Sequence, residues 1–294
     1  MIISFDTELG WGAVENGLWR DRQQRGVYIR TRSVVAELLS LMKDINAPST
    51  WAFVGRMIET EKGISGRSEL KIPSRLLYEA LKSADSHTFE GNDIFKQVAD
   101  AGMGHEIAWH SYYHVCFDSP LIDREYMKLD MEKAKSIGKT YGIEFCSFIF
   151  PQNIEGYLDL ISQHGFTSCR VRPKARLSVW GRLGKTLDFL FYAPPMSYNM
   201  GEVGGLKKFS GSMFFNPGRK RKKWITLYKR RAIKGIKKAV QRAECFHLWC
   251  HPFNFAEVPE LFEAFQYILK LASEERDKGR LSILTMAQYR QLFK

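Results

Sequence analysis

Three groups of acidic and histidine side chains in this 294-residue chain could hold a metal ion and move protons. Asp6 and Glu8 follow a short apolar run, His110 and His114 follow a second, and His251 follows a third. A carboxylate and two imidazoles can hold a divalent metal with room for water. A second carboxylate can take a proton from that water, and a further imidazole can protonate a leaving amine. These residue types point to metal-assisted hydrolysis.

The spacing within each group favours one shared pocket. Asp6 and Glu8 are two residues apart, so they face the same side of a regular strand. His110 and His114 are four apart, so they would be neighbours if the segment formed one turn of helix. Taken alone, each group has a structural explanation, such as a turn or a strand end whose polar atoms bond to the backbone.

Apolar runs and helical periodicity place these groups at the ends of parallel strands. Strands are predicted over residues 1–6, 50–55, 104–109, 144–151, 167–171 and 245–250, with a strand or strand stub over 281–286. Helices are predicted over residues 31–44, 74–83, 91–101, 122–141, 154–164, 222–242 and 258–272. This alternation predicts a parallel sheet, either a barrel or a doubly wound sheet, whose active site forms at the carboxyl ends of the strands.

Residues 173–221 interrupt the alternation. They contain Pro194-Pro195, several glycines and Asn216-Pro217-Gly218, so we expect an irregular insertion there. The sequence has no internal repeat. We therefore expect a single domain over residues 1–294, with a loop and helix elaboration near residues 173–242.

The positive charge of the chain is concentrated in one segment. The net charge is +12, yet fourteen Lys and Arg and no Asp or Glu lie between Lys207 and Arg242, so the rest of the chain sums to −2. The helix predicted from Lys222 to Arg242 has one apolar and one basic face. It could be a solvated outer helix, or it could lie on an anionic membrane surface. We expect no nucleic-acid partner, because no nucleic-acid motif accompanies the charge.

The sequence favours a cytoplasmic protein. No apolar run approaches the ~20 residues that span a bilayer, and Met1 leads directly into an apolar strand without a basic leader. The five cysteines are scattered and odd in number, which argues against a disulfide framework and a cysteine zinc site. The basic helix adds the expectation of a peripheral position at the inner face of a membrane.

Three motifs resemble those of the polysaccharide deacetylases of the NodB-homology type (carbohydrate esterase family 4), in the branch with an Asp-x-Glu first motif. These enzymes remove acetyl groups from N-acetylated sugars. The resemblance runs in order over about residues 1–290, and its second motif is the most specific. The motifs are Ser4-Phe5-Asp6-Thr7-Glu8, Gly104-His105-Glu106-Ile107 leading into His110-Ser111-Tyr112-Tyr113-His114, and Leu248-Trp249-Cys250-His251-Pro252.

The resemblance implies a distorted (β/α)7-type barrel of parallel strands, a bound divalent metal, usually Zn²⁺, and an acid–base pair. It assigns Asp6 as the general base, His251 as the general acid, and Glu8, His110 and His114 as metal ligands, although Asp6 and Glu8 could exchange roles. The implied substrate is an acetylated sugar. We expect a lipid-linked or nucleotide-linked saccharide in surface polysaccharide or O-antigen assembly.

One position departs from the family pattern. The family has an arginine two residues before Pro151, where it orients the base, and this chain has Ile149 there. Arg170 or Arg172, at the end of the next strand, could supply the guanidinium instead. The departure leaves open a non-catalytic carbohydrate-binding descendant. A second alternative is a metal-independent C–N hydrolase on the same fold, because some members of the family with the Asp-x-Glu spacing work without metal. The residues predicted to contact substrate are Trp11, Gln152, Asn153, Arg170 and Trp249.

Overall fold

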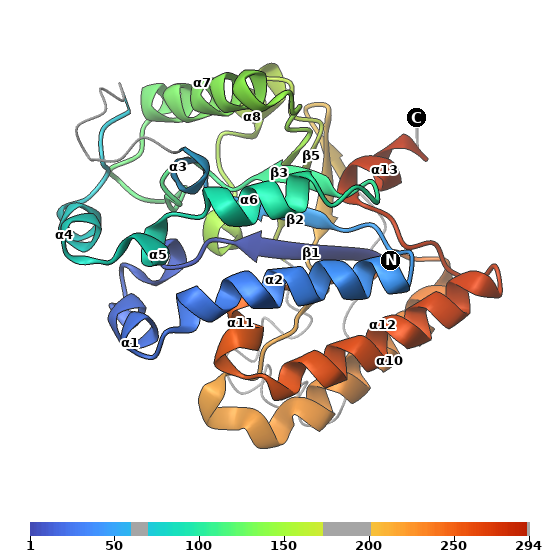
Figure 1. The fold of residues 1–294 in the computed structure, drawn as a ribbon. Helices are drawn as coiled ribbons and strands as arrows, with labels where there is room; N and C mark the ends of the chain where they lie inside the picture. The colour runs from blue at the N-terminus through green and yellow to red at the C-terminus, as the bar shows by residue number, and fades with distance from the viewer. Residues whose placement is uncertain (60–69, 173–200, 293–294) are drawn as a thin grey trace, which may run out of the picture.

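A mostly parallel sheet forms the centre of the fold (Figure 1). The computed structural model describes residues 1–59, 70–172 and 201–292. In these residues the sheet has nine strands in the order β6-β7-β5-β4-β3-β2-β1-β9-β8, and only the β6–β7 pair is antiparallel. The strands are Ile2–Thr7 (β1), Thr50–Phe53 (β2), Glu106–Trp109 (β3), Ser147–Ile149 (β4), Ser168–Val171 (β5), Gly201–Val203 (β6), Leu206–Ser210 (β7), Met213–Phe214 (β8) and His247–Cys250 (β9).

The sheet curls into a half-barrel with helices around it (Figure 1), which confirms the predicted barrel-type architecture. All seven predicted helices are present, with ends shifted by a few residues. The α-helices are Leu18–Gln24 (α1), Val27–Asp44 (α2), Gly55–Ile58 (α3), Arg75–Ser83 (α4), Ser86–Phe89 (α5), Asn92–Ala99 (α6), Arg124–Tyr141 (α7), Leu158–Gln163 (α8), Ile225–Arg242 (α10), Pro252–Glu257 (α11), Glu260–Asp277 (α12) and Met286–Gln291 (α13). The 3-10 helices are Trp11–Ala13 (η1), Pro151–Asn153 (η2) and Arg219–Trp224 (η4).

Alternation along β1 sorts its side chains between two environments. Ile3 and Phe5 belong to the main hydrophobic core, whereas Ile2 belongs to a smaller cluster with residues of β2, β3 and β4. Because side chains alternate along a strand, Ser4 and Asp6 lie on the same side as Ile2. The concave side of the sheet therefore contains buried polar groups below the predicted site.

One sequence prediction about the sheet was wrong. Residues 201–214 were expected to be part of an irregular insertion, but they form β6, β7 and β8. In β7 the two buried apolar residues, Leu206 and Phe209, are separated by two lysines, so the strand lacks the usual alternation. The strand or strand stub expected over residues 281–286 is present as a single bridge, between Leu284 and Ile2. Residues 173–200 of the expected insertion lie outside the described residues.

The basic helix α10 uses its apolar face inside the protein. Ala232, Ile236 and Ala239 are buried, and the helix packs against α12. Gly235 lies so close to the Phe246 ring that a Cβ there would come within 2.4 Å of it. The apolar face is therefore not available to enter a bilayer. Among the described helices, none has the length and apolarity needed to cross a membrane.

Candidate active site

The carboxyl edge of the sheet, where the parallel strands end, brings the predicted site residues together. Glu8 follows β1, His110 follows β3 and His251 follows β9. β1 lies between β2 and β9, and β3 is the next strand beyond β2. Groups that are more than 100 residues apart in the sequence therefore meet at one end of neighbouring strands.

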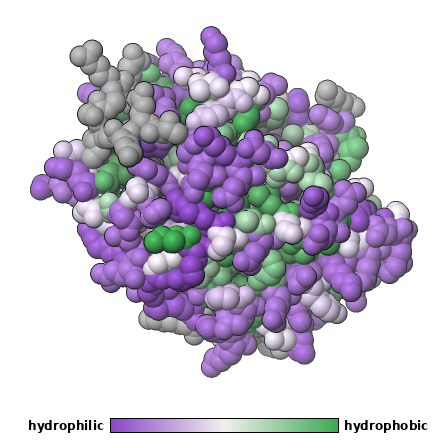
Figure 2. Space-filling model, in the orientation of Figure 1, coloured by the Kyte–Doolittle hydropathy of each residue, from purple (hydrophilic) through white to green (hydrophobic). Residues whose placement is uncertain are grey.

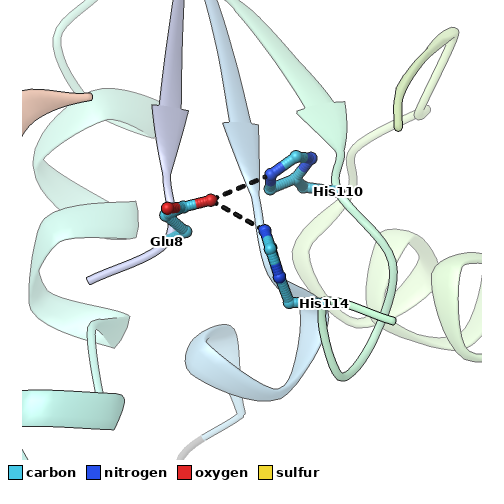
Figure 3. A group of neighbouring side chains, drawn as sticks. All are labelled: Glu8, His110 and His114. Carbon is cyan, nitrogen blue, oxygen red and sulfur yellow. Dashed lines mark hydrogen bonds and ion pairs between the residues drawn. The ribbon is translucent and has the colours of Figure 1, made fainter. Parts of the chain in front are cut away.

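Glu8, His110 and His114 form a compact buried cluster (Figure 3). Glu8 Oε2 lies 3.3 Å from His110 Nε2 and 2.8 Å from His114 Nε2. One possible ligand atom from each residue lies within 4.8 Å of the others. The contact with His114 lacks hydrogen-bond geometry, so its buried Nε2 has no hydrogen-bond partner among the described residues. One carboxylate and two imidazoles with an unpartnered nitrogen fit a divalent cation such as Zn²⁺.

A backbone carbonyl group fixes the orientation of the His110 ring. Its Nδ1 donates a hydrogen bond of 2.6 Å to the backbone carbonyl of Ile149, which leaves Nε2 to face Glu8. Burial lowers the pKa of His110 below its ordinary value, so burial favours the neutral ring that a metal requires. A histidine ligand whose other nitrogen binds a carbonyl is typical of metal sites.

The two histidines converge through a loop, and the predicted helical turn is absent. Ser111 and His114 have φ values of +62° and +55°, in the left-handed region that non-glycine residues seldom adopt. Backbone amides at the start of α3 bind this loop, since Gly55 N donates to Ser111 O and Arg56 N to Tyr112 O, each at 2.9 Å. Such backbone strain persists only where surrounding contacts impose it, and it is concentrated at functional sites.

Asp130 of α7 holds the same loop through three hydrogen bonds. Its carboxylate accepts from Ser111 Oγ at 2.8 Å, from Tyr112 N at 2.7 Å and from Trp109 Nε1 at 2.8 Å. Burial raises its pKa to about 6 despite these donors. Sequence reasoning missed Asp130. The available signal was an acid next to Met131, on the apolar face of the predicted helix.

Asp6 is engaged separately from the Glu8 cluster. Arg170 of β5 donates two hydrogen bonds to its carboxylate, from Nη1 to Oδ1 at 2.6 Å and from Nη2 to Oδ2 at 2.5 Å. Arg170 is fully buried and also donates to Asn153 Oδ1 at 2.9 Å and to Ser4 Oγ at 3.1 Å. Burial alone would raise the pKa of Asp6, but the guanidinium holds it below its ordinary value.

His251 faces both carboxylates. Its Nε2 lies 3.3 Å from Glu8 Oε1 and 4.0 Å from Asp6 Oδ2. Its Nδ1 lies 3.2 Å from Asn254 Oδ1 and its ring stacks on Phe253. Because an amide oxygen only accepts, Nδ1 donates to Asn254 and Nε2 is presented to the space between Asp6 and Glu8.

Solved structures share this architecture at low sequence identity. A protein described as a polysaccharide deacetylase, from Mycobacterium smegmatis, matches with a TM-score of 0.64 and 14% identity, over 99% of this chain and 88% of that one. Another described in the same way, from Pseudomonas aeruginosa PAO1, matches with a TM-score of 0.55 and 11% identity, over 93% and 84% of the two chains. The PuuE allantoinase matches with a TM-score of 0.55 and 11% identity, over 98% and 87%. Neither a family model nor a curated protein matches the sequence.

The chain has the polysaccharide deacetylase fold. On this fold the missing arginine has a structural explanation. Ile149 of β4 and Arg170 of β5 are paired positions on neighbouring parallel strands, so their side chains point to the same side of the sheet. The guanidinium thus comes from the neighbouring strand. Arg172 is the other candidate for this role, but it instead donates to the backbone carbonyl of Gln152 at 3.4 Å.

The remaining predicted substrate contacts surround the cluster. Trp11 is buried, donates from Nε1 to the Phe89 carbonyl at 2.9 Å, and lines a pocket together with His114 and Gln152. The Arg170 guanidinium lies 4.2 Å from the centroid of the Trp249 ring, and the Phe214 ring stacks on the Trp249 ring. These contacts explain how the side chains are held in place. Their role toward substrate stays a prediction, as it does for Asn153 and Arg170.

One polar residue at the pocket was not predicted. Glu15 lines the same pocket, and Gln152 Nε2 donates to its Oε2 at 3.4 Å. Gln152 and Asn153 both have positive φ values, of 53° and 54°, directly after Pro151. The strained turn after β4 and the segment after β1 therefore meet across the pocket. No local pattern around Glu15 in the sequence indicates this contact.

Proposed function

We propose that this protein is a hydrolase that removes acetyl groups from an N-acetylated sugar, with a divalent metal, most simply Zn²⁺, held by Glu8, His110 and His114. The observation that carries the proposal is the separation of the two carboxylates. Glu8 faces two imidazoles, whereas Asp6 is paired with a buried arginine. The shared fold with polysaccharide deacetylases and the order of the sequence motifs support the same reaction.

The different surroundings of Asp6 and Glu8 also favour one of the two assignments of base and metal ligand that the sequence left open. Glu8 is the carboxylate within reach of both His110 and His114, so we assign it as the third ligand. Both oxygens of Asp6 accept from Arg170, and each keeps another lone pair. Asp6 can therefore accept a proton while Arg170 fixes its position.

The protein residues then have distinct chemical tasks. A bound divalent cation supplies Lewis-acid chemistry, because it polarises a carbonyl and lowers the pKa of water. Asp6 takes a proton from the attacking water at a carboxylate oxygen, and Arg170 keeps that carboxylate ionised beforehand. His251 presents Nε2 to the same space, where it can give a proton to the leaving amine. Because Nδ1 donates to Asn254 Oδ1, Nε2 has a proton to give only in the doubly protonated ring, and Asn254 fixes the orientation of that ring.

The substrate that we propose is a lipid-linked or nucleotide-linked saccharide in surface polysaccharide or O-antigen assembly. The pocket beside His114 combines the aromatic rings of Trp11 and Tyr113 with the polar groups of Glu15 and Gln152, a mixture that suits a sugar. We also propose a cytoplasmic location. The five cysteines are all unpaired, as is usual in a reducing compartment.

Acetate release from a panel of N-acetylated saccharides, combined with elemental analysis, tests the proposal. We expect turnover with stoichiometric metal, loss of turnover in Asp6→Asn and His251→Ala with the fold retained, and loss of metal in His114→Ala. If the purified protein carried no metal and chelators left turnover unchanged, the zinc assignment would be wrong. If a folded, metal-loaded protein released no acetate from any substrate, the deacetylase assignment itself would fail.

A metal-independent C–N hydrolase is the second candidate function. It is supported by the match of the fold to an allantoinase, whose TM-score of 0.55 equals that of one polysaccharide deacetylase and is below the 0.64 of the other. The discriminating measurement is turnover after exhaustive chelation. This candidate predicts that His114→Ala retains turnover, whereas the leading proposal predicts that the same variant is inactive.

A further inference from the structure

We propose that the carboxyl edge of the sheet docks on an anionic lipid surface, with the mouth of the candidate active site facing the bilayer. This inference goes beyond the proposed reaction and does not depend on it, because docking can be measured without turnover. It rests on exposed apolar side chains and on a basic segment at the same edge.

Exposed large apolar side chains are concentrated at this edge. Eight are exposed in the described residues, and five of them lie on α1, α4, the start of α2, or the loop after His114. α1 follows β1 after the short 3-10 helix η1, and Figure 1 shows α1 and α4 at the end of the molecule to which the β1 arrow points. Leu121 lines the pocket that contains His114, as does Leu77 of α4. The five side chains are Leu18, Ile29, Leu76, Tyr78 and Leu121.

The basic segment η4 lies at the same edge. It follows β8, which runs parallel to β9, so it begins beyond the carboxyl end of the sheet. The pKa of Asp21 on α1 is lowered mainly by its bond with Arg25 and further by the charge of Arg219, so Arg219 lies within electrostatic range of α1. No acidic residue occurs between positions 207 and 242. The exposed basic residues of η4 include Arg219, Arg221, Lys222 and Lys223, of which Lys222 also pairs with Glu260.

The combination of the two features identifies the partner. Single exposed leucines are normal on a protein surface, and a basic segment alone could bind any polyanion. A bilayer with anionic lipids satisfies both, because its interface takes up apolar side chains and its headgroups attract Lys and Arg. By contrast, hydrophilic residues cover much of the face over α2, α6 and α12, with apolar residues in small separate areas (Figure 2).

This mode of docking differs from the one that the sequence predicted. A helix lying on the membrane over residues 222–242 would insert its apolar face, but α10 buries that face against the protein. The leucines that we expect to enter the interface come instead from α4 and from the loop after His114. Leu121 lines the pocket, and Leu76 is next to Leu77, which also lines it. Docking would therefore bring the pocket to the lipid surface, where a lipid-linked saccharide is presented.

Sedimentation of the full-length protein with lipid vesicles tests the proposal. The probes are vesicles of phosphatidylcholine alone and of phosphatidylcholine with phosphatidylglycerol, at low and high salt. We expect binding to the anionic vesicles at low salt and much weaker binding at high salt. Arg221→Glu/Lys223→Glu should weaken binding by at least about 25-fold, from about fivefold for each basic side chain.

The apolar contribution is tested by Leu76→Ser/Leu121→Ser, in which both positions are more than 60% exposed, so the fold should persist. Binding should weaken by about fivefold for each leucine that enters the interface. Matched controls lie away from this edge. Leu292→Ser changes a leucine that is 64% exposed after α13, and Lys43→Glu/Lys270→Glu makes the same change in net charge on α2 and α12.

The outcomes separate a membrane from other partners. Loss of binding in both edge variants, with both controls like the wild type, supports the proposal. Absence of binding to anionic vesicles at low salt overturns it. Binding that is lost in the charge variant but unchanged in the leucine variant also overturns it, since that pattern describes a site for a soluble polyanion.

Discussion

Each end of β3 has a histidine and a glutamate whose carboxylate is at least partly buried, and the two ends differ in what surrounds these groups. At the amino end, Glu106 Oε2 accepts from Thr50 Oγ1 at 2.9 Å and from Ala287 N at 3.0 Å, and His105 Nδ1 contacts Ser49. These partners are hydroxyls and backbone amides. At the carboxyl end, Glu8 meets three imidazoles from two other segments.

The pKa values of the two glutamates shift in opposite directions. Burial raises the pKa of Glu106, and its hydrogen-bond donors offset this only in part. Burial would also raise the pKa of Glu8, but His251 and His114 hold it well below its ordinary value. Desolvation of a carboxylate is therefore found at both ends of β3, whereas several ionisable side chains converge on the carboxylate at the carboxyl end. That convergence is what marks a functional site.

The sharpest test of this comparison replaces each glutamate with its amide. Glu8→Gln removes the proposed carboxylate ligand, so metal affinity and acetate release should fall by more than about 100-fold. Glu106→Gln keeps an acceptor for Thr50 and Ala287, so metal content and turnover should be unchanged. Elemental analysis and turnover of both variants provide the measurement. Equal losses in the two variants would remove the distinction between the two ends.

Breaking the Asp6–Arg170 pair should have the next largest effect. Arg170→Ala leaves a buried carboxylate without its cation, so the free energy of unfolding should fall by about 3–5 kcal/mol. Urea unfolding measures this loss. Adding Ile149→Arg to Arg170→Ala returns a guanidinium from the paired strand position, so part of the lost stability and turnover should be recovered. An Ile149→Arg single variant shows whether the added arginine is tolerated by itself.

Substitution of Asp130 should affect the carboxyl end of β3 and leave the amino end unchanged. Asp130→Ala leaves Ser111 Oγ, Tyr112 N and Trp109 Nε1 without their acceptor, so the loop should loosen and metal affinity should fall by about 10–100-fold. Competition with a metal indicator measures the affinity. A matched control is Ser147→Ala, which removes a buried hydrogen bond to Ser168 at 2.7 Å and does not touch the loop. Similar losses of metal affinity in both variants would contradict a specific role for Asp130.

His247, the first residue of β9, should affect stability and leave the chemistry unchanged. Burial, and then the nearby Arg170, lower its pKa well below 6.5, so the folded protein resists protonation where the unfolded chain accepts it. The stability from this neutral histidine is present above pH 6.5 and is lost as the pH falls toward the folded-state pKa. The loss should approach ~1.4 kcal/mol per pH unit. His247→Gln should reduce this slope in urea unfolding between pH 7 and pH 5; an unchanged slope would refute the assignment.

Local sequence signals were sufficient for much of the framework. The apolar run of β1 and the periodicity of α7 are strong patterns, and α7 also begins at a capping residue, Asp123, and ends at Gly142. Strand β7 escaped prediction because its burial does not alternate, and β8 because it has only two residues. Their place in the sheet is set by β5 and β9, which pair with them.

The sequence predicted which residues form the site better than it predicted how they are arranged. Strand ends placed Asp6, Glu8, His110 and His251 together, and the structure brings them to one edge. The loop conformation at His114 depends on contacts from α3 and α7, so the spacing of the histidines alone suggested a helical turn. Pairing between β4 and β5 decides whether Arg170 or Arg172 reaches Asp6, and no local pattern records that pairing.

The pairing of Ile149 with Arg170 also constrains how this site could have arisen. If an ancestor carried the arginine on β4, moving it to β5 took two substitutions. Losing the first arginine early would have left the Asp6 charge buried alone, at a cost of about 3–5 kcal/mol, a large share of the stability of most domains. Gaining the second arginine first keeps the charge paired at every step. If the ancestor did carry the arginine on β4, an intermediate with arginines on both strands is therefore the less costly route.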